Sequence, residues 1–273
     1  MTARLNPSPP VTSRLQGKNL QLGYGQRVIC EQLNLQISDG AFTVIIGPNG
    51  CGKSTLLRSL ARLIKPSTGQ ISLDGKDIHR YPAKFVATQL GLLPQSSTAP
   101  EGICVADLVA RGRYPHQSLL KQWSQKDEDA VASAMHATGI TELAEQNVDA
   151  LSGGQRQRVW VAMALAQQTS ILLLDEPTTY LDIAHQIELL ELFRTLNEQG
   201  RTLVAVLHDL NHACRYASHL IVMKEGQIVA TGTPRQIMTP ELVENVFGLP
   251  CLIIDDPISH TPMIIPRGKP HLR

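Results

Sequence analysis

The chain has 273 residues, of which 42% are hydrophobic, and this length allows one large domain or two modest domains with a buried core. Lys and Arg number 25 against 24 Asp and Glu, so the formal net charge of +1 lacks the basic excess that is typical of a nucleic-acid binder. No run reaches the ~18 apolar residues of a membrane-spanning helix. The five cysteines are scattered and lack metal-site spacing, which favours reduced thiols in a cytoplasm: Cys30, Cys51, Cys104, Cys214 and Cys251.

The start of the chain predicts a disordered end followed by short strands. Residues 1–14 are polar and rich in proline and lack the apolar stretch of a signal peptide, so we expect them to be disordered. Apolar patterning predicts strands at 19–22 and 28–37, joined by a turn that contains Tyr24. The ring of Tyr24 is either that of an ordinary turn tyrosine or a surface for stacking on adenine.

A complete phosphate-binding loop follows the apolar run 41–46 and precedes the helical run 56–64. Its glycines let backbone N–H groups wrap around phosphates, and the helix N-terminus adds its positive dipole. Lys53 supplies a charge for the β- and γ-phosphates of a triphosphate, and the Ser54 hydroxyl is placed to ligate Mg²⁺. The helix N-terminus also predicts a lowered thiol pKa at Cys51. The expected binding residues are Gly47, Pro48, Asn49, Gly50, Cys51, Gly52, Lys53, Ser54 and Thr55.

The next part of the chain predicts a second sheet and then a helical lobe. A strand at 70–73 followed by an Asp-Gly turn indicates a small antiparallel sheet beside the sheet of the phosphate-binding loop. The apolar run 90–95 predicts a buried strand that places Gln95 at its end, where it can touch Mg²⁺ or an attacking water. A mainly helical pattern then extends over about 96–168 and predicts an inserted lobe.

A Ser-Gly-Gly-Gln turn precedes a helical run at 156–168. Ser152 is a plausible N-cap, and a hydroxyl with free N–H groups at a positive helix end can also receive a phosphate. Since the chain already has one phosphate cradle, a head-to-tail dimer in which this turn closes on the partner's nucleotide is one physical solution. The alternative is an ordinary helix cap. The residues concerned are Ser152, Gly153, Gly154 and Gln155.

Two later strands end in residues suited to phosphate chemistry. The apolar run 171–174 is followed by Asp175, which is placed to hold Mg²⁺, and by Glu176, which can polarise the attacking water. A strand ending near residue 207 leads to His208, whose place at the same edge of the sheet favours a contact with the γ-phosphate. Asp182 is either the N-cap of the next helix or a residue of a dimer interface.

In their order along the chain, these motifs resemble those of the ATP-binding cassette family. The resemblance covers about residues 15–250 and implies an α/β P-loop NTPase fold with a RecA-like core, a small antiparallel β-subdomain and an inserted helical subdomain. Residues 251–273 are then a short C-terminal extension. The segment 109–116 and the form Thr-Thr-Tyr-Leu-Asp at 178–182 are similar to those of iron(III)-siderophore importers of the ferric enterobactin type. Many cassettes have Ser-Ala where this chain has Thr179-Tyr180.

The resemblance implies an ATPase with ATP and Mg²⁺ as its ligands, which works as a homodimer on the cytoplasmic face of the inner membrane. Its other partners are membrane-spanning permease subunits and, indirectly, a periplasmic substrate-binding protein, and no nucleic acid is expected. We expect the surface between Gln95 and Arg113 to contact the permease. The implied catalytic residues are Glu176, His208 and Gln95, and the implied metal ligands are Ser54, Gln95 and Asp175.

Other functions remain open at this point. An importer ATPase for haem, cobalamin or another metal chelate shares these motifs, and the sequence separates importers from exporters poorly. A chromosome or repair ATPase would carry a long coiled coil between its phosphate-binding loop and its Ser-Gly-Gly turn, and the sequence lacks sustained heptads there. A translation factor of the superfamily normally has two cassettes and basic linkers, whereas this chain has one cassette and a net charge near zero. A cassette ATPase without a transport role is the remaining alternative.

Overall fold

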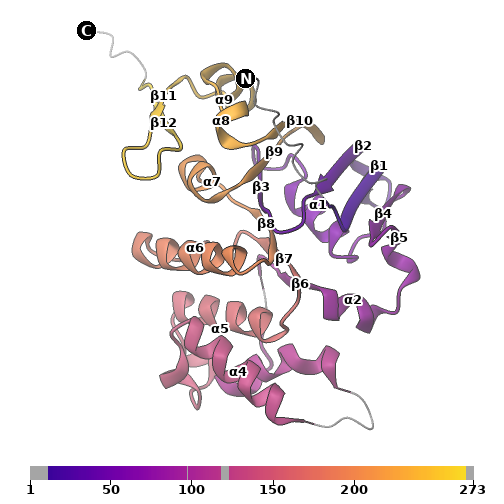
Figure 1. The fold of residues 1–273 in the computed structure, drawn as a ribbon, viewed down its shortest axis with the longest axis vertical. Coiled ribbons are helices and arrows are strands. Elements are labelled where there is room, and N and C mark those ends of the chain that lie inside the picture. The colour runs from indigo at the N-terminus through magenta and orange to yellow at the C-terminus, as the bar shows by residue number, and fades with distance from the viewer. Residues whose placement is uncertain (1–11, 97, 118–122, 269–273) are drawn as a thin grey trace, which may run out of the picture.

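A six-stranded sheet runs through the middle of the molecule (Figure 1), whose computed structural model describes residues 12–96, 98–117 and 123–268. The strand order is β10-β9-β3-β8-β7-β6, in which β10 is antiparallel to β9 and the other pairs are parallel. Every residue of β3, β7 and β8 is buried, as their continuous apolar runs require of strands covered on both faces. The strands are β3 (Phe42–Ile46), β6 (Leu90–Leu93), β7 (Ile171–Asp175), β8 (Thr202–Val206), β9 (His219–Lys224) and β10 (Gln227–Gly232).

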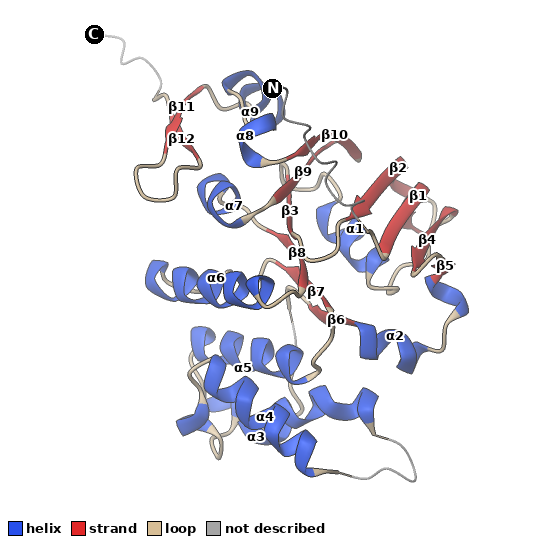
Figure 2. Ribbon diagram, viewed as in Figure 1, coloured by secondary structure: helices blue, strands red, loops and turns tan. Residues whose placement is uncertain are grey.

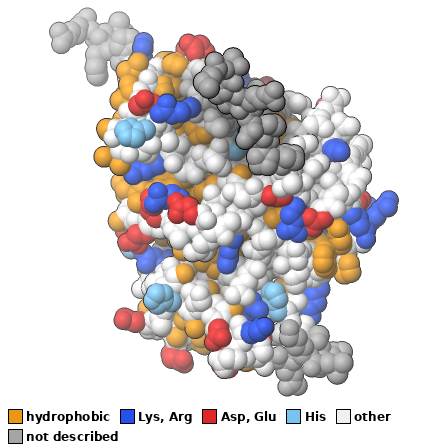
Figure 3. All heavy atoms as spheres, in the orientation of Figure 1, with side chains coloured by type: hydrophobic (Ala, Val, Ile, Leu, Met, Phe, Trp, Pro, Cys, Tyr) orange, Lys and Arg blue, Asp and Glu red, His pale blue; other side chains and the backbone are white. Residues whose placement is uncertain are grey.

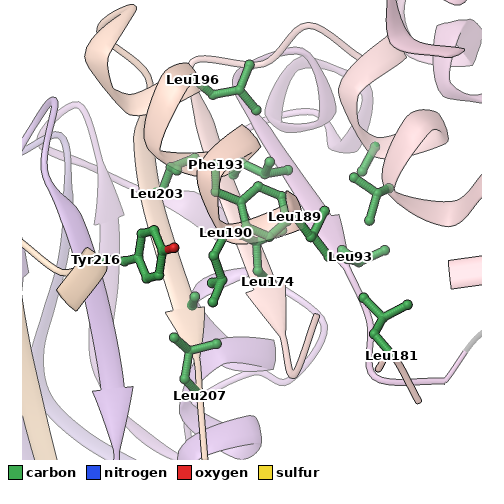
Figure 4. Packing of buried hydrophobic residues seen from close by; sticks show 14 of the residues in the cluster. Leu93, Leu174, Leu181, Leu189, Leu190, Phe193, Leu196, Leu203, Leu207 and Tyr216 are labelled. Atoms are coloured by element: carbon green, nitrogen blue, oxygen red, sulfur yellow. The ribbon is translucent and has the colours of Figure 1, made fainter. Parts of the chain in front are cut away.

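Helices cover both faces of this sheet and divide the core into two clusters. Alternate residues of β3 enter different clusters: Val44 packs with α6 (Ile183–Glu198) and α7 (Leu210–Tyr216), while Ile45 packs with α1 (Lys53–Leu60). Figure 4 shows Phe193 of α6 lying against Leu174, Leu190 and Leu203 in the first cluster. Among the residues that the structure describes, no helix combines the length and the apolar content needed to cross a membrane.

A separate four-stranded antiparallel sheet packs beside α1, as the sequence predicted, in the order β2-β1-β4-β5. Residues 1–11 of the segment that was expected to be disordered lie outside the described residues. Ser13 and Arg14 are described, and they bind the sheet through Ile37 O at 2.8 Å and Asp74 Oδ1 at 2.6 Å. The elements here are β1 (Leu15–Tyr24), β2 (Arg27–Ile37), β4 (Thr68–Leu73), β5 (Lys76–Asp77), the 3₁₀ helix Ile78–Arg80 and α2 (Ala83–Gln89).

The helical lobe lies at the end of the molecule next to β6, where Figure 2 shows only helices and connecting segments. Its α-helices are α3 (Val105–Ala110), α4 (Gln125–Ala137) and α5 (Gly153–Ala166), and its 3₁₀ helices are Arg111–His116, Thr141–Leu143 and Val148–Ala150. Apolar residues of α3 and α5, such as Val109 and Val161, are fully buried within the lobe and join the first core cluster. The lobe is therefore packed onto the same core that supports β7 and α6.

Arg113 ends the segment from Gln95 whose surface was expected to contact the permease, and its own side chain is buried. Its Nε donates a 2.8 Å hydrogen bond to Asp127 Oδ1, and its Nη1 donates at 2.6 Å to Ala166 O. Arg113 and Asp127 are 5% and 4% exposed. The pair thus ties the segment after α3 to α4 and to the end of α5, and it holds the lobe together from inside.

Residues 251–273 were predicted to be a short C-terminal extension, and 251–266 of them fold into a hairpin. β11 (Cys251–Asp255) and β12 (Pro262–Pro266) form a hairpin that follows α8 (Pro234–Ile237) and α9 (Pro240–Phe247). Asn211 of α7 bonds both backbone groups of Ile264, accepting from its N at 2.7 Å and donating to its O at 3.3 Å. Figure 3 shows orange hydrophobic side chains at the upper left, over this hairpin, where Leu252, Ile254 and Ile258 are exposed.

Replacing Asp127 by Asn leaves the Arg113 guanidinium buried without a counter-charge, and breaking a buried pair typically costs about 3–5 kcal/mol. We expect Asp127→Asn to lower the free energy of unfolding by roughly this amount, as measured by urea denaturation at neutral pH. Asp129 is exposed on the same helix. Asp129→Asn is the matched control and should change the stability by no more than about 0.5 kcal/mol.

The contribution of Asp127 to the stability of the fold depends on pH. The hydrogen bond from Ser124 is the largest cause that lowers the pKa of Asp127 from 3.8 to about 2, burial opposes it, and Arg113 adds to the lowering. Since the folded-state pKa lies below the unfolded value, the carboxylate stabilises the fold above about pH 4, and this contribution is lost as the pH falls toward 2. The difference in the free energy of unfolding between the parent and Asp127→Asn should become smaller over this pH range. A difference that stays constant would contradict the lowered pKa of Asp127.

Candidate functional site

The phosphate-binding loop is shaped by close backbone neighbours. A Cβ atom on Gly47 would lie 2.2 Å from the carbonyl oxygen of Met223, so any side chain there would displace β9. The Gly226 N–H donates a 3.1 Å hydrogen bond to Cys51 O, which ties the loop to the β9–β10 turn. Gly52, the N-cap of α1, has a φ of 104° and provides no side-chain cap. The first N–H groups of α1 therefore remain available for an anion.

Lys53 is held inside this loop. Its Nζ donates hydrogen bonds of 2.8 Å to Gly47 O and 2.9 Å to Pro48 O, and the residue is 5% exposed. Two carbonyl oxygens thus hold a buried ammonium group among the N–H groups of the loop. The resulting concentration of positive charge suits the phosphates of a nucleotide.

Ser54 and Asp175 form a pair of oxygen groups at the end of β7. The Ser54 hydroxyl donates to Asp175 Oδ1 at 2.8 Å, and Arg58 Nε lies 3.5 Å from the other carboxylate oxygen. Asp175 is fully buried, and this burial raises the pKa of its carboxyl against the Ser54 hydrogen bond and the Arg58 charge. No described residue donates a hydrogen bond to Oδ2.

This pair fits Mg²⁺, which prefers hard oxygen ligands and keeps part of its coordination for waters and substrate phosphates. The buried Asp175 Oδ2 has spare lone pairs, and the Ser54 hydroxyl lies next to the same carboxylate. The described residues contain no group of three or more His, Cys, Asp or Glu side chains that could hold a metal ion. The chain thus provides two ligands beside a phosphate cradle rather than a complete protein cage.

Glu176 is contacted by residues from two neighbouring strand ends. Gln95, after β6, donates a 2.7 Å hydrogen bond to Glu176 Oε2, and His208 Nε2, after β8, lies 2.7 Å from Oε1. Since β7 lies between β6 and β8 and all three are parallel, their carboxyl ends meet at one edge. Glu176 has a φ of 53°, an unusual backbone conformation for a residue with a side chain. The structure therefore brings together the three residues that the sequence predicted as catalytic.

The Ser-Gly-Gly turn begins α5 and lies beside Tyr180 and Leu181. Ser152 caps α5, because its hydroxyl accepts from Gln155 N at 3.3 Å while Gln155 Oε1 accepts from Ser152 N at 3.0 Å. No hydrogen bond or ion pair among residues 12–96, 98–117 and 123–268 joins this turn to the phosphate-binding loop. Tyr24 ends β1 with 51% of its surface exposed, so its ring is accessible for stacking.

The sequence-based expectation for the Cys51 thiol is wrong. Burial is the largest influence on this group and raises its pKa, although the Lys53 charge and backbone hydrogen bonds oppose the shift. Cys51 is 5% exposed and packs in the same cluster as Cys30, whose thiol pKa burial raises to about 11. The helix N-terminus therefore does not make Cys51 a reactive thiolate at neutral pH.

With this geometry established, comparison with known proteins identifies the family. The family model described as "ABC transporter" matches residues 30–179, from β2 to the turn after Glu176. The ferric enterobactin transport ATP-binding protein of Escherichia coli (strain K12) is 61% identical over 94% of this chain and 95% of its own length. The chain belongs to the ABC transporter family. It is an ATP-binding cassette and an ATPase of that family.

Solved structures agree with this assignment. An ABC transporter described as of the metal-chelate type, in an inward-facing conformation, matches with a TM-score of 0.79 and 30% identity over 94% of this chain and 98% of that chain. A dimeric cassette in a post-hydrolysis state with bound ADP and Pi matches with a TM-score of 0.72 and 28% identity over 80% of this chain and 98% of that chain. The predicted cassette fold, with two sheets and a helical lobe, is confirmed.

Sequence reasoning missed two contacts in this site. Arg58 lies five residues after Lys53 in α1, and the helix directs it toward Asp175. Thr179 Oγ1 lies 3.5 Å from Glu176 Oε2, within the turn that follows β7. The i,i+4 spacing from Ser54 could have indicated that Arg58 lies near the same carboxylate. The position of Thr179 depends on the backbone of one turn, for which the sequence contains no comparable signal.

Because the Cys51 pKa is raised, we expect a bulky thiol reagent to inhibit ATP binding only slowly at pH 7. The rate should rise by about tenfold per pH unit up to pH 9, in proportion to the thiolate fraction. Bound ATP should protect the thiol. The measurement is the rate of loss of nucleotide binding across this pH range. Inhibition that is unchanged in Cys51→Ser would assign the effect to another cysteine, and fast inhibition of the parent at pH 7 would contradict the raised pKa.

Proposed function

We propose that this cassette hydrolyses ATP to energise the import of an iron(III)-siderophore, similar to ferric enterobactin, across the bacterial inner membrane. The observation that supports the chemistry is the convergence of Gln95 and His208 on Glu176 at the edge of the sheet. The observation that supports the cargo is the 61% identity, along almost the whole chain, to a ferric enterobactin transport subunit. Residues 15–250 form the cassette in this proposal, with the helical lobe at about 96–168.

Binding of ATP uses positive groups that the fold has already arranged. The N–H groups of the loop and of the start of α1 hold the phosphates, and the Tyr24 ring stacks on adenine. The Lys53 ammonium, now held by two carbonyl oxygens, exchanges part of this contact for the β- and γ-phosphate oxygens. Thr55 and the remaining residues of the loop complete the cradle.

Glu176 is the general base in this proposal. It accepts a proton from the water that attacks the γ-phosphate, a role that typically contributes about 10²–10⁴-fold to the rate. Both of its oxygens are now engaged, one by Gln95 and one by His208. Each carboxylate oxygen keeps a second lone pair, so Glu176 can accept a proton while Gln95 and His208 orient its side chain, and His208 lies at the same edge for contact with the γ-phosphate. Gln95 orients the water on the other side.

Ser54 and Asp175 are the residues that would hold Mg²⁺, with Gln95 as a further ligand at the same edge. When bound, Mg²⁺ neutralises the charge that develops on the phosphate oxygens. The chain itself contributes a buried carboxylate and a hydroxyl that are already 2.8 Å apart. Arg58, 3.5 Å from Asp175 Oδ2, compensates part of the buried negative charge.

Cassettes of importers work as dimers, and a solved relative of this fold is dimeric. In our proposal, Ser152, Gly153, Gly154 and Gln155 of one cassette close over the γ-phosphate held by the other. The N-terminus of α5 carries a partial positive charge, and no hydrogen bond among the described residues joins this turn to the phosphate-binding loop of its own chain, which supports such a composite site. A two-fold pairing then completes both sites at once.

The permease contact is proposed at a groove of about 520 Å³ between α2 and the helical lobe. Apolar residues such as Leu63 and Tyr114 line it together with Arg111. Tyr114 is 73% exposed and Leu63 is 65% exposed, as expected of side chains that meet a partner. The groove includes Arg111 and Gly112, which belong to the segment between Gln95 and Arg113 that was expected to contact the permease. The cassette then lies on the cytoplasmic face of the membrane, and a periplasmic substrate-binding protein delivers the cargo from the other side.

The runner-up cargo is another metal chelate, such as haem or cobalamin. The match to a transporter of the metal-chelate type supports this alternative, because that similarity concerns the whole cassette and not one cargo. Nothing in the proposed mechanism brings the cargo into contact with this chain. The choice between the two cargoes therefore depends on uptake measurements rather than on the ATPase site.

Deleting the gene for this chain should abolish uptake of a ferric catecholate siderophore, measured with radioactive iron. Supplying the parent chain should restore uptake, whereas a Lys53→Ala chain should not, because it loses the charge that contacts the phosphates. Uptake of an unrelated nutrient is the control and should stay unchanged. Normal siderophore uptake in the deletion strain, together with lost haem or cobalamin uptake, would support the runner-up.

Glu176→Gln keeps the shape of the side chain but cannot accept a proton, so we expect hydrolysis to fall by roughly 10²–10⁴-fold while ATP binding survives. Since the γ-phosphate is then not cleaved, this variant should accumulate as an ATP-dependent dimer in size-exclusion chromatography. Lys53→Ala should bind nucleotide weakly and form no such dimer. Hydrolysis at the parental rate by Glu176→Gln in the assembled transporter would overturn the assignment and make His208 the next residue to test.

A further inference from the structure

The buried Asp175 carboxylate has a cation beside it whose part in metal binding the proposed mechanism does not address. Asp175 is 0% exposed, its Oδ1 accepts a 2.8 Å hydrogen bond from Ser54, and Arg58 Nε lies 3.5 Å from its Oδ2. This last distance exceeds the roughly 2.7–3.2 Å of a typical N–H···O hydrogen bond, and no described residue donates to Oδ2. Arg58 therefore neutralises the carboxylate without occupying the lone pairs of that oxygen.

The ion pair between Arg58 and Asp175 is loose in comparison with the ion pair inside the helical lobe. Arg113 lies 2.8 Å from Asp127, both side chains are almost fully buried, and Ala166 O accepts a further hydrogen bond from the same guanidinium. The Arg58 side chain, in contrast, is 35% exposed. Because its long side chain already reaches solvent, the guanidinium can leave Asp175 and be hydrated without any movement of α1.

Helix geometry brings a metal ligand and this cation to the same carboxylate. Ser54 and Arg58 are four residues apart in α1, so they lie on one face of the helix and both meet Asp175. Lys53, the other basic residue of α1, donates instead to two carbonyl oxygens of the phosphate-binding loop. Within the part of the chain that the structure describes, Arg58 is thus the only cation in an ion pair with Asp175.

We propose that Arg58 competes with Mg²⁺ for the Asp175 carboxylate and thereby sets how strongly ATP binding depends on Mg²⁺. This inference rests on the Mg²⁺ site of the proposed function. Each of the two cations neutralises the same buried charge, and two cations at one carboxylate repel each other. Arg58 is therefore a positioning residue, which holds the carboxylate in place and whose contact weakens when the metal binds.

A competing cation affects both the stability of the fold and the binding of the metal. A carboxylate with no exposed surface destabilises a fold unless its charge is compensated, and an arginine remains charged at every physiological pH. The same charge opposes Mg²⁺, so part of the binding free energy of the metal is used to displace the guanidinium. Weaker retention of Mg²⁺ in turn favours its release with the products of hydrolysis.

The test compares the full parent chain with Arg58→Gln, which removes the charge and keeps a polar side chain. The measured quantity is the dissociation constant of a slowly hydrolysed fluorescent ATP analogue in EDTA, divided by that in saturating Mg²⁺. We expect this ratio to rise by roughly tenfold at about pH 8, because a short-range charge repulsion is lost. The charge-preserving Arg58→Lys should stay near the parental ratio. Lys65→Gln, at an exposed lysine beyond the end of α1, is the matched control and should leave the ratio unchanged.

Thermal denaturation gives a second measurement, which a purely structural role of Arg58 would not reproduce. Arg58→Gln should have a lower midpoint than the parent in EDTA, because the buried carboxylate has lost its counter-charge. This difference should largely disappear with Mg²⁺ and the ATP analogue, since the metal then neutralises the same carboxylate. An equal lowering of the midpoint under both conditions would show that Arg58 only supports the fold.

That result, or an unchanged ratio of dissociation constants, would overturn the inference and leave the proposed function intact. A variant that folds only with Mg²⁺ and the analogue would support the inference, and a variant that folds under neither condition would overturn it. If the parent binds the analogue equally well in EDTA and in Mg²⁺, the Mg²⁺ site of the proposed function is itself wrong.

Discussion

The contacts of the Glu176 carboxylate require a particular arrangement of strands, and much of the fold follows from that arrangement. Glu176 is held at 2.7 Å by residues from two other strand ends, so β6, β7 and β8 must be parallel neighbours that end at the same height. Parallel neighbours need crossover connections, and these are the helices that cover both faces of the sheet. The strands between those helices are buried on both sides, which is why β7 and β8 are continuously apolar up to their polar ends.

The phosphate-binding loop obeys a different constraint, which is close approach of backbone. Met223 O leaves no room for a side chain at Gly47, and the Gly226 N–H is bonded to Cys51 O. The conformation of the loop therefore depends on β9 and the β9–β10 turn, which are distant in the sequence, as well as on its own glycines. Rigid support of this kind keeps N–H groups in place before a nucleotide arrives, so little ordering cost accompanies binding.

Sequence patterns predicted both sheets, the helical lobe and the grouping of Gln95, Glu176 and His208, because strand ends and loop motifs are local signals. They failed where burial determines the property of a side chain. Cys51 was predicted to be an activated thiol, and it is enclosed in a core cluster. No sequence pattern indicated that Arg113 is buried against Asp127. α2 and the hairpin of β11 and β12 are too short for a periodic pattern to stand out, and the left-handed backbone at Tyr180 depends on hydrogen bonds from two helices.

The two hydrogen bonds between Asn211 and Ile264 affect the order in which this part of the chain folds. Asn211 lies in α7, which begins two residues after His208, and its two hydrogen bonds reach a strand 53 residues further along the chain. During synthesis, α7 leaves the ribosome well before the strand that braces it, and domains are made at about 5–20 residues per second. The hydrogen bonds between Asn211 and Ile264 therefore form after the packing of Ala213 and Cys214 of α7 against β3 has become possible.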